Sequence, residues 1–178
     1  MRKLLNEELD RLSVEAYKKA WKIPVVVVLD NVRSQNNIGS VFRTADAFRL
    51  EGIILCGITA TPPHREIHKT ALGATESVRW EYREETTLAI RELKKKGYRI
   101  MPVEQAEGAV PLDRLKLSPR EKYALVLGHE IRGVDQKVLD LSDQCIEIPQ
   151  FGTKHSLNIS VAAGLIIWEV FKQFPLQE

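Results

Sequence analysis

Asn37 and Arg43 are the first residues along the chain whose types and surroundings indicate chemistry. They lie within Asn31 to Ala45, NVRSQNNIGSVFRTA, a polar stretch that follows an apolar run and leads into a helical pattern. A guanidinium can bind a phosphate or stabilise an oxyanion, because it presents several N–H donors in a fixed plane. A lone Asn and Arg more often form a helix cap and a solvated charge. The density of polar groups ahead of this helix instead favours a binding site.

The helix that carries Arg43 is expected over residues 38–48, with Asn37 as its N-cap. Gly39 lies one turn before Arg43 on the same face. Because glycine has no side chain, we expect Gly39 to leave room for a ligand to approach Arg43.

A second polar group, Leu125 to Val134, has the sequence LVLGHEIRGV. An apolar strand is predicted to end at Gly128, where glycine permits either a tight turn or the close approach of a ligand. Glu130 follows at once, and its carboxylate either caps the next turn or belongs to a site. Its position favours the site, since ligands of α/β proteins bind beyond the carboxyl ends of parallel strands.

A third group, Ile148 to Glu169, repeats this order of strand, glycine-containing polar loop and helix, with the sequence IPQFGTKHSLNISVAAGLIIWE. Ser156 or Asn158 is expected to cap the helix. The residues from Val161 to Trp168 are apolar around the whole circumference, so this helix must be buried on more than one side. A partner subunit could cover the side that the sheet does not. The alternative is a central core helix in a monomer.

Short apolar runs alternate with helical patterns along the chain, which predicts an α/β fold with a mainly parallel sheet flanked by helices. Strands are expected at residues 25–29, 53–56, 78–82, 98–103, 123–127 and 145–148. Further helices are expected at residues 4–21, 85–96, 136–141 and 157–174. Residues 59–75 contain two adjacent prolines and are expected to be irregular.

The composition fits one globular domain, with 178 residues of which 44% are hydrophobic. A formal net charge of +2 is too small to indicate nucleic-acid binding by itself, so any basic patch must be local. Apolar stretches are far shorter than the roughly 20 residues that span a bilayer, and the N-terminus has no apolar signal region, so neither a membrane partner nor secretion is expected. Cys56 and Cys145 are far apart and lack metal-site spacing, which indicates reduced core residues in the cytoplasm.

Taken together, these three stretches of sequence resemble the motifs of the SpoU/TrmH-type RNA ribose 2'-O-methyltransferases of the SPOUT superfamily. The matching elements are N-x-G-x-x-x-R-T-A, L-V-x-G-x-E-x-x-G and I-P-x-x-G-x-x-x-S-L-N-x-S-V-A-A, and the resemblance covers about residues 24 to 172. It implies a methyltransferase domain over residues 24–178 with a C-terminal deep trefoil knot, preceded by a helical extension over residues 1–23. It also implies a homodimer that binds S-adenosylmethionine in the knot and uses no metal.

The resemblance assigns roles to individual residues. Arg43 would be the catalytic arginine, and the remaining motif positions would orient it, the cofactor methyl and the ribose; they are Asn37, Glu130, Ser156 and Asn158. The cofactor-binding positions would be Val103, Leu127, Gly128, Ile148, Gln150 and Leu157. Basic residues in expected loops are candidate RNA contacts, although each alone is more often a solvated charge; they are Arg33, Arg65, Lys69, Arg132 and Lys154.

The family proposal makes the arginine a general base. A guanidinium gives up its proton only far above neutral pH, so we favour a cationic Arg43 that stabilises the developing alkoxide and holds a phosphate. Many relatives carry a preceding RNA-binding domain. Here only the helix at residues 4–21 is expected before the first strand, so that helix, the loops or the dimer surface would select the RNA, either tRNA or rRNA.

Three other functions compete with this interpretation. A nucleotide-dependent oxidoreductase would also show alternating strands and helices, but no G-x-G-x-x-G follows the first strand. A catalytically silent RNA-binding or dimerisation module would not need the intact motifs. A base-methylating relative is the nearest competitor, and the arginine in its expected place favours the ribose.

Overall fold

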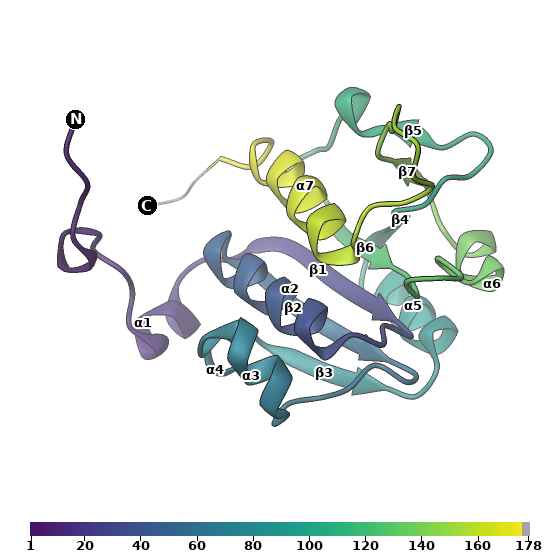
Figure 1. Ribbon diagram of the computed structural model, residues 1–178. Coiled ribbons are helices and arrows are strands. Elements are labelled where there is room, and N and C mark those ends of the chain that lie inside the picture. Colours follow the sequence, from purple (N-terminus) through teal and green to yellow (C-terminus); the bar gives the residue numbers. More distant parts are fainter. Residues whose placement is uncertain (176–178) are drawn as a thin grey trace.

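The computed structural model describes residues 1–175 and contains a five-stranded sheet in the order β3-β2-β1-β6-β4 (Figure 1). Every neighbouring pair in this sheet is parallel. Its strands are β1 (Ile23–Asp30), β2 (Leu50–Cys56), β3 (Trp80–Arg83), β4 (Tyr98–Pro102) and β6 (Lys122–Leu127). The predicted α/β class with a mainly parallel sheet is therefore confirmed.

Helices cover both faces of this sheet. They are α1 (Val14–Lys19), α2 (Gln35–Ala47), α3 (Arg65–Ala71), α4 (Ala74–Ser77), α5 (Thr86–Lys95), α6 (Gln136–Asp140) and α7 (Ile159–Phe171), with short 3₁₀ turns at Asn6–Glu8 and Leu112–Arg114. Helices α2, α3 and α7 pack on one face, and α5 and α6 pack on the other. None of these helices is both long and apolar enough to cross a membrane.

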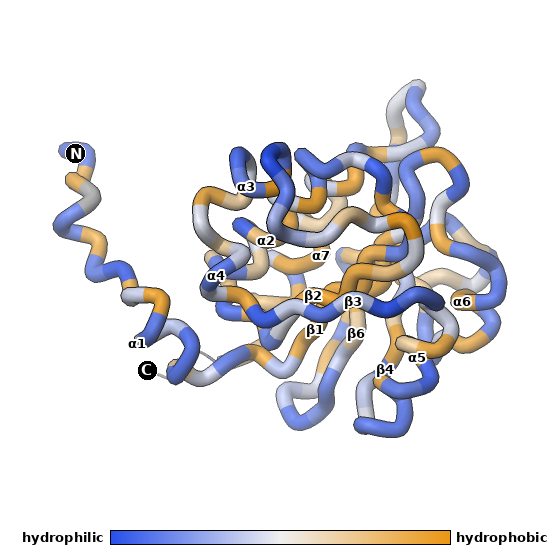
Figure 2. The backbone as a smooth tube through the Cα atoms, turned by 90° about the horizontal axis from the view of Figure 1, so that it is seen from below, coloured by the Kyte–Doolittle hydropathy of each residue, from blue (hydrophilic) through white to orange (hydrophobic). Residues whose placement is uncertain are grey.

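Strand β1 lies at the centre of the sheet because its side chains are apolar on both faces. Val25, Val27 and Leu29 join the core under α2 and α7, while Val26 and Val28 join the core under α5. In Figure 2 the orange, hydrophobic stretches of β1 and β2 lie near the centre of the molecule, and blue, hydrophilic stretches lie mostly at its periphery. Since the strands are parallel, the loops that leave β1, β4 and β6 emerge at one edge of the sheet.

The apolar run at residues 145–148 forms a strand outside the main sheet. β7 (Ile146–Glu147) pairs in parallel with β5 (Val110–Pro111) in a separate two-stranded sheet. It is linked to the end of β4 by a single bridge from Val103 to Ile146. The predicted strand is therefore present but shorter than expected, and it lies next to the carboxyl end of β4.

The predicted helix at residues 4–21 is wrong, because only a 3₁₀ turn and the short α1 form there. Asp10 has a left-handed φ of 42°, which interrupts a right-handed helix, and Ser13 caps α1 by accepting a hydrogen bond from the Ala16 N–H at 3.2 Å. Leu5 and Leu12, which a packed helix would bury, are exposed. The 3₁₀ turn near the N-terminus lies away from the body of the molecule in Figure 1, so Leu5 has no core to pack against.

The segment at residues 59–75, expected to be irregular, contains α3 and the start of α4. His64 caps α3, because its Nδ1 accepts the Glu66 N–H at 3.3 Å. Ile67 and Ala71, four residues apart on α3, are buried, and so is Ala74 at the start of α4. The prolines precede this helix and do not break it.

The predicted division at residue 24 and the predicted trefoil knot stay predictions. Strand order and pairing alone do not fix how a chain threads through its own loops. Residues 176–178, the end of the predicted domain, lie outside the described residues.

Candidate active site

A cavity of about 490 Å³ opens at the carboxyl edge of the sheet. Its walls come from the loops after β4, β6 and β7 and from the start of α7. All the predicted cofactor positions line it: Val103, Leu127, Gly128, Ile148, Gln150 and Leu157. Glu130, Ser156 and Asn158 line it too. The structure thus brings two of the three motifs together around one space.

The turn after β6 fixes one wall of the cavity. His129 N–H donates to the Gly133 carbonyl at 3.0 Å, and Gly133 N–H donates back at 2.8 Å. The Nδ1 atom of His129 accepts the Ile131 N–H at 3.0 Å, which holds the tip of the turn. A Cβ on Gly128 would overlap the Gly133 carbonyl and the Val134 nitrogen. Of the two alternatives for Gly128, the structure therefore requires glycine for the tight turn itself.

Glu130 connects this turn to the loop before α2. Its Oε1 accepts the Ser34 N–H at 2.9 Å and its Oε2 accepts the Arg33 N–H at 3.1 Å. Burial opposes ionisation, but these hydrogen bonds outweigh it and hold the pKa of Glu130 below its usual value. The carboxylate is thus charged at neutral pH. It does not cap its own turn, and it joins two motifs that are almost a hundred residues apart.

Asn37 and Asn158 join the first and third motifs. The Nδ2 group of Asn158 donates to Oδ1 of Asn37 at 3.3 Å, while its Oδ1 accepts the Ser160 N–H at 2.9 Å. Of the two candidates for the cap of α7, Asn158 is the one observed. The predicted N-cap at Asn37 is wrong. Ser34 caps α2 one turn earlier by accepting the Asn37 N–H at 3.3 Å, which leaves the Asn37 side chain to meet Asn158.

Arg43 is exposed on α2 and does not line the cavity. It lines a separate hollow of about 640 Å³ bounded by α2, the junction of α3 and α4, and parts of residues 9–17. The expectation that Gly39 leaves room for a ligand beside Arg43 is wrong. A Cβ on Gly39 would overlap Thr70 Oγ1 and the Ile67 carbonyl oxygen, so α3 already fills that space.

Sequence reasoning missed Glu104 and Gln105, which directly follow β4 and line the cavity. Glu104 Oε2 accepts the Val134 N–H at 2.9 Å, and Gln105 Nε2 donates to the His155 carbonyl at 2.7 Å. They tie the loop after β4 to the other two cavity loops. Their position just beyond the end of a strand was the signal available in the sequence.

The candidate RNA contacts are all exposed, but they do not form one group. Arg132 lines the cavity, and Lys154 lies in the loop before α7. Arg33 lies before α2, and its backbone N–H is bound to Glu130. Arg65 and Lys69 lie on α3, and not in a loop as expected.

The chain matches the SpoU rRNA Methylase family over residues 24–168, which is most of its length. It belongs to this family. A relative from Staphylococcus haemolyticus, named as a TrmH family tRNA/rRNA methyltransferase, is 32% identical over 90% of this chain and 63% of its own length. The 23S rRNA (guanosine-2'-O-)-methyltransferase RlmB of Nitrosomonas europaea is 32% identical over 84% of this chain and 56% of its own.

The solved structures give the same result. An AdoMet-bound rRNA methyltransferase from Sinorhizobium meliloti superposes with a TM-score of 0.80 at 26% identity, over 93% of this chain and 62% of that one. The chain spans less than two thirds of the length of all three proteins.

Proposed function

We propose that this chain is an S-adenosylmethionine-dependent RNA methyltransferase that methylates a ribose 2'-hydroxyl of tRNA or rRNA. The observation that carries the proposal is the meeting of the three motifs. Glu130 and Asn158 line the cavity, and they hydrogen-bond to Ser34 and Asn37 at the start of α2, the helix that carries Arg43. The Nitrosomonas relative, whose name specifies guanosine 2'-O-methylation of 23S rRNA, supports the ribose as acceptor.

The cavity fits the cofactor in size and in lining. Its volume of about 490 Å³ lies in the range of small-molecule sites, about 300–1,000 Å³. Val103, Leu127 and Ile148 supply apolar walls for a base and ribose, and Glu104 and Glu130 supply charge. We therefore assign cofactor binding to the six predicted positions. S-adenosylmethionine supplies a methyl group already activated by a sulfonium.

The position of Arg43 supports a homodimer. Arg43 lines no part of the cavity of its own chain, so a complete site requires the arginine of a second copy. Val161, Leu165 and Trp168 follow one another at helical spacing on α7, and each is about half exposed. A second copy covering this apolar face would bury it and bring the partner arginine to the cavity. The cavity and the catalytic arginine would then come from different chains.

In the proposed reaction, Arg43 stays cationic. A ribose hydroxyl is a poor nucleophile until its proton leaves. The guanidinium of Arg43 would therefore accelerate methyl transfer by stabilising the alkoxide that develops and by holding the adjacent phosphate. The proton passes to another group or to water. Holding the partners in line contributes up to about 7–11 kcal/mol in well-oriented cases. Arg43→Lys distinguishes the roles, because a base or a bare charge survives it and bidentate geometry does not.

The test is transfer of labelled methyl from S-adenosylmethionine to total RNA that lacks its own modifications. We expect transfer by the wild type, with strong loss in Arg43→Ala and in Gly128→Ala, whose Cβ breaks the turn of the cavity wall. Gly152→Ala is the matched control, because a Cβ there meets nothing within 4 Å. Cofactor binding measured calorimetrically should survive Arg43→Ala and fail in Gly128→Ala. Wild-type protein that binds no cofactor and transfers no methyl would refute the proposal.

We also propose a cytoplasmic location. Both cysteines are free thiols, which suits a reducing compartment.

A further inference from the structure

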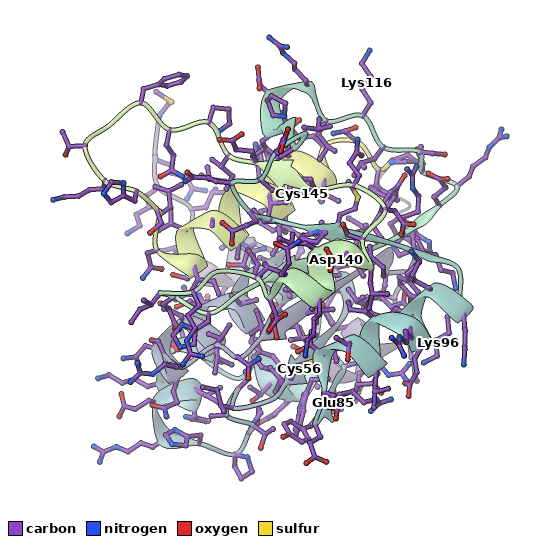
Figure 3. The ribbon with its side chains drawn as sticks, turned by 90° about the vertical axis from the view of Figure 1, so that its right-hand side faces the viewer. Cys56, Glu85, Lys96, Lys116, Asp140 and Cys145 are labelled. Atoms are coloured by element: carbon purple, nitrogen blue, oxygen red, sulfur yellow. The ribbon has the colours of Figure 1, made fainter. Side chains whose placement is uncertain are left out.

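Phe151 is the most exposed aromatic side chain among residues 1–175, with 98% of its surface open to solvent. An exposed phenylalanine gains nothing from burial, so the fold itself does not require it. A Cβ added to the next residue, Gly152, would meet nothing within 4 Å, so this tip of the loop is unpacked. In Figure 3 the pale green loop that leads into α7 stands out from the body of the molecule.

This loop is nevertheless anchored at the mouth of the cavity on both sides of Phe151. Gln150 lines the cavity just before it, and His155, Ser156 and Leu157 line the cavity just after it. The His155 carbonyl accepts the Gln105 hydrogen bond at 2.7 Å, which ties the loop to the segment after β4. The ring of Phe151 therefore stands one residue beyond the cavity wall.

The other loop tip at the cavity has the same character. Ile131 is 80% exposed and Arg132 is exposed, and both line the cavity from the turn that His129 holds. Lys154, on the Phe151 loop, is a second exposed cation besides Arg132. Neither Arg132 nor Lys154 forms an ion pair with a carboxylate among the residues that the structure describes.

An aromatic ring among cations is the combination that recognises unpaired nucleotides. The base stacks on the ring while the cations hold the phosphates. In an A-form duplex each base face is covered by its neighbours, so a protruding ring has nothing to stack on. An apolar protein surface could bind the two apolar loop tips, but it would offer no phosphates to Arg132 and Lys154.

We propose that Phe151 is a stacking platform for an unpaired base beside the target ribose, and that the substrate presents this ribose in a single-stranded loop or bulge. This inference rests on the proposed function and specifies the substrate class of the same site. It makes Phe151 a determinant of RNA binding, with no part in holding the cofactor.

The experiment uses short RNAs of one sequence, cut from the RNA that the wild type methylates. One form holds the target nucleotide in a hairpin loop and the other pairs it with a complementary strand. We expect the wild type to methylate the loop form and not the duplex. Phe151→Ala should lower kcat/KM on the loop form by about five- to 150-fold, the range of one lost base stack. Phe151→Tyr should stay within about twofold of the wild type, and Phe151→Leu should be as poor as Phe151→Ala.

Ile58→Ala is the matched control, because Ile58 is 64% exposed and does not line the cavity. It should leave kcat/KM unchanged. Binding of S-adenosylhomocysteine and the mass by light scattering should be the same in all variants. A wild-type rate in Phe151→Ala, or equal methylation of the duplex, would overturn this inference alone. Loss of the dimer in Phe151→Ala would instead make Phe151 an interface residue. No methyl transfer by the wild type would overturn the proposed function, and this inference with it.

Discussion

Replacing Gly39 by alanine separates local helix preference from packing between helices. Gly39 lies in the interior of α2, where alanine is favoured over glycine by about 1 kcal/mol. Helix preference alone therefore predicts that Gly39→Ala stabilises the chain. The structure predicts the opposite sign, because the new Cβ would overlap Thr70 Oγ1 and the Ile67 carbonyl oxygen of α3.

The size of the effect follows from which atoms must move. The Thr70 hydroxyl can rotate away, although it then loses its 3.0 Å hydrogen bond to the Asn36 carbonyl. The Ile67 carbonyl belongs to the α3 backbone, and the Ala71 nitrogen lies 3.0 Å from the new Cβ, so α2 and α3 must separate. Overpacking of this kind costs about 1–3 kcal/mol. Because backbone atoms of α3 must move as well as a side chain, the cost lies in the upper part of this range, about 2–3 kcal/mol. Subtracting the helix preference of about 1 kcal/mol leaves an expected net loss of about 1–2 kcal/mol.

Denaturant unfolding followed by circular dichroism measures this difference. A loss of about 1–2 kcal/mol corresponds to a fall in Tm of about 2–8 °C for a chain of this size. Gly152→Ala is the control, because a Cβ there meets nothing and its φ is ordinary, so stability should be unchanged or slightly higher. A Gly39→Ala variant as stable as the wild type, or more stable, would show that α3 does not pack on Gly39.

Four further predictions follow from the structure. Glu130→Gln should lower methyl transfer about tenfold or more, while Glu121→Gln should not. Arg33 and Ser34 donate to different oxygens of Glu130, and the amide nitrogen that replaces one of these oxygens cannot accept an N–H. The pKa of Glu130 is lower in the folded state than in the unfolded chain. The charged carboxylate therefore stabilises the fold fully above its ordinary pKa of about 4.3, and this stabilisation is lost as the pH falls through the folded-state pKa. The denaturant midpoints of the wild type and Glu130→Gln should differ at pH 7 and converge in acid. Leu165→Glu on the exposed face of α7 should give a monomer by light scattering that binds cofactor but transfers no methyl, and a dimeric variant would locate the interface elsewhere. Burial raises the pKa of Cys56 to about 12, so thiol reagents at pH 8 should label it only after unfolding. Labelling of the folded protein should be the same in the wild type and Cys56→Ala, and weaker labelling of folded Cys56→Ala would contradict this.

The sequence was sufficient for the features set by local pattern. Strand β1 is a continuous apolar run, and such runs predict buried parallel strands and the edge at which their polar loops gather. The six cofactor positions, which only the family resemblance implies, line one cavity at this edge. The motifs that lie next to a strand end were the easiest to place.

Contacts between distant segments could not be predicted. The bond from Glu130 to Ser34 joins residues 96 positions apart, and that from Asn158 to Asn37 joins residues 121 positions apart. Gly39 was misread because its neighbour on α3 is invisible in the local pattern. The helix expected at residues 4–21 does not form as one element, because Leu5 and Leu12 stay exposed and packing does not stabilise it.

The chemical position of the transferred methyl group tests the central claim most directly. After labelled transfer to unmodified RNA, alkaline hydrolysis cleaves every phosphodiester next to a free 2'-hydroxyl. Ribose methylation predicts label in alkali-resistant dinucleotides, and loss of that label with Arg43→Ala. Label released in mononucleotides would mean methylation of a base, and it would contradict both the proposed reaction and the role of Arg43.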